Sequence, residues 1–312
     1  MAQNITDELI KRTRGFCTSC INAIAPQFLK IKDSLSGDSF AESVGFLMSS
    51  LDLTTDDIVF LLEHNRYWDV PILFRSILDG TSQCLYLLSA PCKEEETQRL
   101  NEYRNILPRK EWASLEQPVV QIKKTSLCQD NKNLEGALVD ALHEKIQQEK
   151  TGEGESARVK AVVAKWRFKE LSKVLRRECP QWAASADMWE YRYAISNFMV
   201  HKSGLGCKHL IEEVREIRTH YDSSSVAYAM PLLISSAVLL FDRLFIFSER
   251  FKLDSRHLLN VMEQNISFFT NAASAEDVAR EVVARQFEEA NSGVTEKSIS
   301  DKKGEHRDVR KH

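Results

Sequence analysis

The stretch Ser225–Phe251, SVAYAMPLLISSAVLLFDRLFIFSERF, decides the fold class. Residues 227–241 carry no charge, and the apolar pattern resumes after Asp242 and Arg243. A membrane-spanning helix needs roughly 20 largely apolar residues without an ion pair in the middle. The uncharged run is shorter and contains Ser235 and Ser236. We therefore interpret it as the central core helix of a bundle and expect no membrane partner.

Apolar residues recur with helical spacing on both sides of this stretch. We expect Pro108 to stop a helix, residues 112–132 to be irregular, and 151–155 to form a loop because of their glycines. The predicted helices are 6–33, 39–51, 54–67, 68–89, 94–107, 133–150, 156–178, 186–202, 225–251, 255–270 and 274–290.

This pattern predicts an all-α, multi-helix bundle whose core helices are 68–89, 186–202 and 225–251. Residues 1–290 form a single helical domain in this interpretation. The tail at 291–312 has almost no apolar residues. Because such a segment cannot bury enough surface to offset its ordering entropy, we expect it to be disordered.

Composition excludes several classes of protein. The net charge of the 312-residue chain is −3, which argues against a generally basic nucleic-acid coat. Its 7 cysteines are scattered, and residues 1–8 have neither the basic nor the apolar part of a signal peptide. These features predict reduced thiols and a cytoplasmic location.

The helix predicted at 186–202 carries the clearest candidate site. Tyr193, Asn197 and His201 are four residues apart, which places them in one stripe among apolar residues. His201 precedes a glycine stop at Gly204 and so lies at the negative end of the helix dipole, which favours the protonated imidazole. His201 is therefore a candidate acid/base group, with helix capping as the structural alternative.

A second candidate lies in the helix predicted at 68–89. Arg75 and Asp79 are one turn apart among apolar neighbours, so they can form a partly buried pair. Because desolvation offsets the attraction within such a pair, it is easier to explain as the organiser of a polar site or helix junction than as a stabiliser. A surface salt bridge is the alternative.

Together these motifs resemble a large, uncharacterised prokaryotic family of helical proteins. The family has an R-x-x-x-E/D helix, an R-x-x-x-Y helix, a tryptophan segment and a helix with Tyr, a small polar residue and His. The resemblance covers residues 59–206. Its positions here are Arg75 and Asp79, Arg99 and Tyr103, Trp166 and Leu171, and Tyr193, Asn197 and His201. The chain departs from the family in having Asp79 for the usual Glu and Asn197 for a frequent Ser.

That family is similar to the HEPN superfamily, many of whose members are RNases of toxin–antitoxin and phage-defence systems. The resemblance implies a HEPN-like core, catalysis by His201 with Asn197 and Tyr193 as orienters, and Arg75, held by Asp79, as the cation for the phosphorane. It also allows a homodimer with a shared cleft and a protein partner from the same operon. Ser196 stands where the HEPN signature requires Arg.

Residues 158–178 contain eight Lys or Arg against two Glu. A basic stripe of this kind can follow an RNA backbone. The simpler alternative is the solvated face of an amphipathic helix. The four residues of the stripe, at i, i+4 spacing, are Lys165, Lys169, Lys173 and Arg177.

We expect no metal and no cofactor. Cys17 and Cys20 have CxxC spacing without a second pair, and Cys207 with His209 follows no zinc spacing. The sequence thus leaves two hypotheses for the function of the protein. One is a metal-independent RNase of a bacterial defence or toxin system, and the other is a non-catalytic helical binding module.

Overall fold

The structure is a computed structural model that describes residues 2–64, 66–124, 134–148, 153–200 and 223–267. These residues form helices joined by short turns, and none of them lies in a strand. The expectation of an all-α bundle is therefore confirmed.

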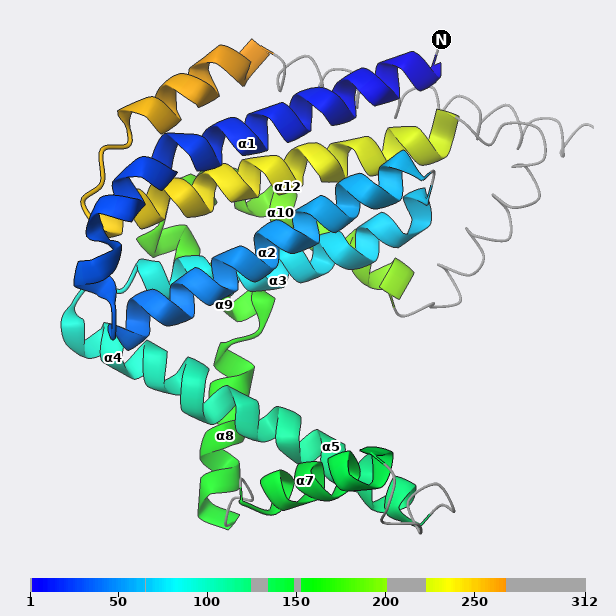
Figure 1. Cartoon of the computed structure of the whole chain (residues 1–312), viewed down its shortest axis with the longest axis vertical. Helices are drawn as coiled ribbons and strands as arrows, with labels where there is room; N and C mark the ends of the chain where they lie inside the picture. The colour runs from blue at the N-terminus through cyan, green and yellow to red at the C-terminus, as the bar shows by residue number, and fades with distance from the viewer. Residues whose placement is uncertain (1, 65, 125–133, 149–152, 201–222, 268–312) are drawn as a thin grey trace, which may run out of the picture.

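Helix α3 (Val70–Leu88) forms the centre of the bundle (Figure 1). Pro71 lies in its first turn, where the missing N–H breaks no helix bond. Most of its side chains are buried, because helices cover it on several sides. These are α2 (Ser39–Glu63), α9 (Phe168–Glu178), α10 (Pro180–Val200) and α12 (Ser223–Arg250).

Helix α12 is the apolar core helix expected from the sequence. Ala229–Arg250 is long and apolar enough to cross a membrane, but 72% of its most apolar window is buried inside the fold, as in the core of a bundle. The charge that interrupts it has a structural role. Fully buried Arg243 donates to Thr81 of α3 at 2.8 Å and to Asp52 of α2 at 2.9 Å, so it ties three helices together.

Helix α1 (Ala2–Leu35) lies along α12 and then bends towards α2 (Figure 1). Pro26 lies inside α1, where its missing N–H and its ring favour a kink. Next to it, the Gln27 amide exchanges two hydrogen bonds with the backbone of Asp254. These two hydrogen bonds anchor the bend of α1 to the turn that precedes a helix at 256–267.

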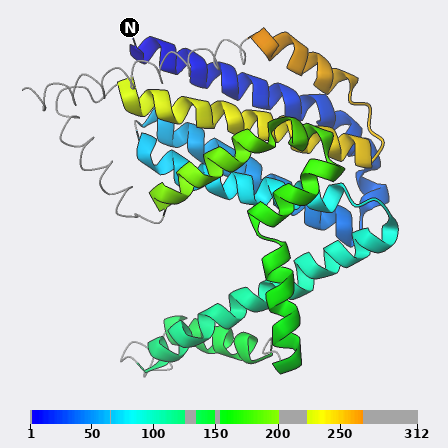
Figure 2. The same cartoon turned by 180° about the vertical axis from the view of Figure 1, so that it is seen from behind.

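A second part of the chain, which we call the arm, projects from the bundle (Figures 1 and 2). It consists of α5 (Leu107–Lys123), α7 (Leu134–Gln148) and α8 (Glu153–Lys165), and both α7 and α8 pack on α5. Helix α4 (Lys93–Asn101) and a π-helical turn, η2 (Glu102–Ile106), lead from the bundle into the arm.

Two predicted breaks are wrong. Residues 39–63 form one helix instead of two, because the hydroxyls of Thr54 and Thr55 bond back to carbonyls four residues earlier instead of capping a new helix.

The second wrong break is at Pro108. The chain remains helical through this proline, and residues 112–123, which were expected to be irregular, are helical. In the π turn before Pro108, Leu107 N–H donates to Glu102 O, so the proline falls in the first turn of α5.

Other boundaries also differ from the prediction. The helix expected at 156–178 is divided at Trp166 and Arg167, where Arg167 has extended backbone (ψ 143°). Helix α10 begins at Pro180 rather than 186. The loop predicted at 151–155 is too long, because residues 153–155 are helical and begin α8. Residues 151–152, the predicted helix at 274–290 and the tail at 291–312 lie outside the described residues.

Candidate functional site

The polar residues predicted from two distant segments lie together where α3 packs on α10. Tyr193 Oη donates to Asp79 Oδ2 at 3.5 Å, and Arg75 Nε lies 3.9 Å from the same oxygen. The Arg75 guanidinium is 5.5 Å from the centre of the Tyr193 ring. Arg75, Asp79 and Tyr193, which we call the α3–α10 cluster, therefore form one contact network.

Phe168, the first residue of α9, fixes the tyrosine in this cluster. Its ring is stacked on that of Tyr193, with centres 4.1 Å apart and planes 6° apart. Phe168 also contacts fully buried Trp182 at 5.9 Å. The stacking holds the ring in place, so the hydroxyl is kept towards Asp79. Phe168 could not be recognised from the sequence, because its position depends on the break between α8 and α9.

Burial dominates the electrostatics of the cluster. It raises the pKa of Asp79, while the Arg75 charge and the Tyr193 hydrogen bond partly offset this effect. Burial and then the Asp79 charge raise the pKa of Tyr193, so the phenol stays protonated. The Arg75 and Asp79 side chains are still 24% and 36% exposed, so solvent and ligands can reach them.

Four buried polar atoms of α3 and α10 have no hydrogen-bond partner in the described part of the chain. Two of them are Arg75 Nε, a donor in the cluster, and Asn197 Oδ1, an acceptor one turn beyond Tyr193. The other two are Trp189 Nε1 and Ser196 Oγ of α10. Unsatisfied buried polar atoms cost free energy, so such atoms beside a partly open cluster are typical of a place where a ligand completes the bonding.

His201 lies outside the described residues, which end on this side at Val200. Ser196 is fully buried. Arg192 donates to Pro231 O of α12 at 2.9 Å, on another side of α10 from the cluster.

The other family-like residues form a second polar cluster where the arm meets the bundle. Arg99 of α4 is almost fully buried and lies 3.9 Å from the centre of the Tyr86 ring. It donates to Tyr86 O at 2.5 Å and to Glu178 at 2.9 Å, which connects α4 with α3 and the end of α9. Arg99 is thus a structural cation with its donors engaged.

Glu102 is the centre of this second cluster, and sequence reasoning missed it. It accepts from the indole of Trp166 at 2.7 Å and from Lys165 at 2.9 Å. The Trp166 ring also contacts Tyr86 and Tyr103, at 5.1 and 5.8 Å. Lys165, which the sequence places in an RNA-binding stripe, is thus paired with a buried carboxylate.

Lys165 is also separated from the other three residues of the basic stripe. Lys165 ends α8, whereas Lys169, Lys173 and Arg177 belong to α9, so the four do not follow one helix. Lys173 pairs with Glu170 at 2.8 Å. Lys169 and Arg177 are exposed. The other three therefore keep their i, i+4 spacing along one face of α9, whereas Lys165 does not continue it.

No group of three metal-ligating side chains occurs among the described residues. Burial raises the pKa of the Cys17 thiol to about 12 and that of Cys20 further, so both stay protonated. Cys207 and His209 fall in the segment 201–222, which the structure does not describe.

No family model, no curated protein and no solved structure matches this chain.

Proposed function

We propose that this chain is a HEPN-like protein that acts on RNA as an effector or accessory factor of a bacterial defence or toxin system. The observation that carries the proposal is the convergence of Arg75, Asp79 and Tyr193 from segments 114 residues apart. Unsatisfied atoms on Arg75 and Asn197 support a ligand there. The defence context and a cytoplasmic location rest on the family resemblance alone.

The proposed chemistry is RNA cleavage without a metal. The 2′-hydroxyl attacks the neighbouring phosphorus, the bond to the 5′-oxygen breaks, and a cyclic phosphate and a 5′-hydroxyl remain. His201 takes the proton from the 2′-hydroxyl and returns one to the leaving oxygen. Arg75 neutralises the charge of the phosphorane. Asp79 and Tyr193 hold the guanidinium in place.

Cleavage of a mixed RNA pool by purified protein, with chelator present, tests this proposal. We expect Arg75→Ala and His201→Ala to lose activity by about a hundredfold or more. Tyr193→Phe keeps the stack on Phe168 but loses the bond to Asp79, so we expect a loss of about tenfold. Arg158→Ala, an exposed arginine of α8, is the matched control and should retain activity.

A non-catalytic binding module is the second candidate. The observation that favours it is Ser196, which is buried at the position where the HEPN signature has Arg, while Arg192 contacts Pro231 instead. RNA that binds wild type but not Arg75→Ala, without cleavage, would establish this alternative. Folded wild-type protein that neither binds nor cleaves RNA would contradict both candidates.

A further inference from the structure

The outer side of α2 carries a row of large apolar side chains. Phe46, Leu53 and Phe60 are 79%, 66% and 56% exposed, although α2 buries its other side against α3. Residues seven apart lie on one face of a helix, about 10 Å from each other. The row is therefore a straight apolar stripe roughly 20 Å long, which we call the α2 stripe. Single exposed apolar residues are normal, but an aligned row is typical of an interaction site.

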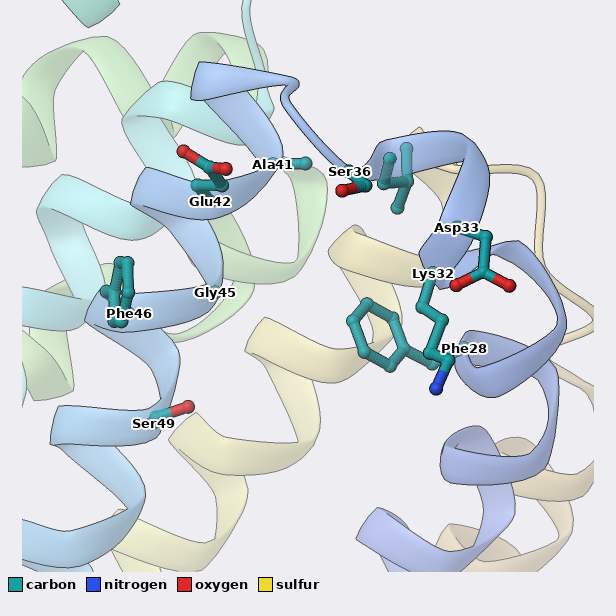
Figure 3. Close-up of a pocket in the computed structure, with 10 residues that line it drawn as sticks. Phe28, Lys32, Asp33, Ser36, Ala41, Glu42, Gly45, Phe46 and Ser49 are labelled. Carbon is teal, nitrogen blue, oxygen red and sulfur yellow. The ribbon is translucent and has the colours of Figure 1, made fainter.

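A pocket opens at one end of the α2 stripe (Figure 3). It has a volume of about 500 Å³ and lies between the bent end of α1 and the first half of α2. Phe28 of α1 and Phe46 of α2 contribute its aromatic surface. Gly45 leaves the floor open, since a Cβ there would meet nothing within 4 Å. Lys32, Asp33 and Glu42 form a charged rim.

The other end of the stripe carries a projecting aromatic pair. The rings of Phe60 and His64 have centres 4.1 Å apart, and His64 Nδ1 is bonded to Phe60 O at 2.8 Å, which fixes the imidazole. Both residues are exposed. The α2 stripe thus has an aromatic-lined pocket at one end and a rigid aromatic pair at the other.

We propose that a second copy of this chain docks on the α2 stripe, with the two α2 helices antiparallel and the two-fold axis at Leu53. A residue that precedes Leu53 by a given number of positions in one copy then faces the residue that follows Leu53 by the same number in the other copy, as an isologous interface requires. Phe46 faces the partner's Phe60, and the Phe60–His64 pair enters the partner's pocket beside Phe28.

The charges fit this register. Asp56 and Asp57 face the partner's Ser50 and Ser49, so no acid is set directly against another acid. Glu42 faces the partner's His64. A parallel arrangement would instead place each aspartate beside its own copy, and like charges in contact are unfavourable. The distribution of acids on α2 therefore selects the antiparallel arrangement.

The buried area is sufficient for a reversible dimer. Three side chains exposed to this degree contribute roughly 400 Å² per copy, on the scale of 150–250 Å² for a buried aromatic residue. A standard interface takes about 800 Å² per partner. The stripe alone therefore supplies about half of a standard interface, which is the scale of a weak, transient association. Helices α2 and α10 lie on opposite faces of the bundle (Figures 1 and 2), so dimerisation through α2 leaves the α3–α10 cluster accessible.

Sedimentation of the full chain over a concentration series tests the proposal. We expect a concentration-dependent dimer that Leu53→Glu weakens by about a hundredfold. Leu138→Glu is the matched control, since Leu138 is 61% exposed on the distant α7, and it should leave association unchanged. A monomer at all concentrations, or equal weakening by both variants, would overturn the proposal.

Cysteine cross-linking tests the register independently of stability. Chains with Ser49→Cys mixed with chains with Asp57→Cys should form mixed disulfide dimers, and neither variant alone should cross-link at that position. Cross-linking of each variant to itself would show a parallel pair and overturn the proposed arrangement. Cys92, which is exposed, is replaced by serine in all these chains.

Discussion

Asp242 is a buried carboxyl group in the middle of α12. Burial raises its pKa from 3.8 to about 7, and the attraction of the neighbouring Arg243 offsets only part of this shift, because Arg243 turns to Asp52 and Thr81. A folded pKa above the unfolded value means that ionisation costs stability. The cost is absent below about pH 4 and grows as the pH rises to about 7.

We expect Asp242→Asn to raise the free energy of unfolding at pH 8 by about 2–4 kcal/mol, since each pKa unit corresponds to about 1.4 kcal/mol. Near pH 4 the variant and the wild type should be equally stable. Urea denaturation at the two pH values measures this difference. Glu263→Gln, at an exposed acid of the helix at 256–267, is the control. The same difference at both pH values would rule out the titration of Asp242 as its cause.

Single residues also show how far the site could be predicted from sequence. Helical spacing alone linked Arg75 with Asp79 and Tyr193 with Asn197, because each pair lies within one helix. That the two pairs meet depends on how α3 packs on α10, which spacing does not determine. Glu102 and Phe168 were missed for the same reason, since their partners lie 64 and 25 residues away.

At the scale of helices, the contact of α2 with α3 depends on Gly80. A Cβ at this position would lie 2.5 Å from Leu51 Cδ2 and 3.2 Å from Leu51 Cγ. Leu51 is itself buried, so it has little room to move. The absence of a side chain at residue 80 therefore lets the two helices approach closely.

We expect Gly80→Ala to destabilise the fold by about 1–3 kcal/mol, because overpacking outweighs the better helix propensity of alanine. In a chain that also carries Leu51→Ala, Gly80→Ala should lower the free energy of unfolding by less than it does in the wild type. Thermal denaturation of the four combinations measures this coupling. Gly15→Ala, at an open position on α1, should instead be neutral or slightly stabilising. A cost at residue 80 that is independent of Leu51 would contradict the packing explanation.

The helix content could be predicted because the apolar spacing is regular. Several helix boundaries could not be predicted in this way. Thr54 and Thr55 have the residue types of a helix cap, but their hydroxyls find acceptors within the same helix. Pro108 has the residue type of a helix stop, but a π turn places it where proline is tolerated. In both cases the local signal was compatible with two structures, and tertiary packing chose between them.

At the scale of the molecule, the bundle and the arm differ in how much they bury. Nearly every turn of α3 contributes buried side chains, whereas Val119 is the only residue of α5 that is buried. Opening of the arm therefore exposes little apolar surface. Regions with few buried contacts open at lower free energy than the core.

We expect amide hydrogen exchange to be slowest in α3 and in the centre of α12, and faster by at least about tenfold in α5 and α7. Exchange read out by mass spectrometry of peptides, with full-chain protein, measures this order. Equal protection in α5 and α3 would show that the arm and the bundle open as one unit.

The π turn at Glu102–Ile106 determines the direction in which the arm projects from the bundle. A π turn holds one residue more than an α-helical turn, and each residue rotates the following helix by about 100°. Deletion of a single codon here, for example that of Asn105, would restore α-helical geometry and swing the arm to another side of the bundle. Relatives that differ by one residue in this turn would therefore present the same arm in a different direction.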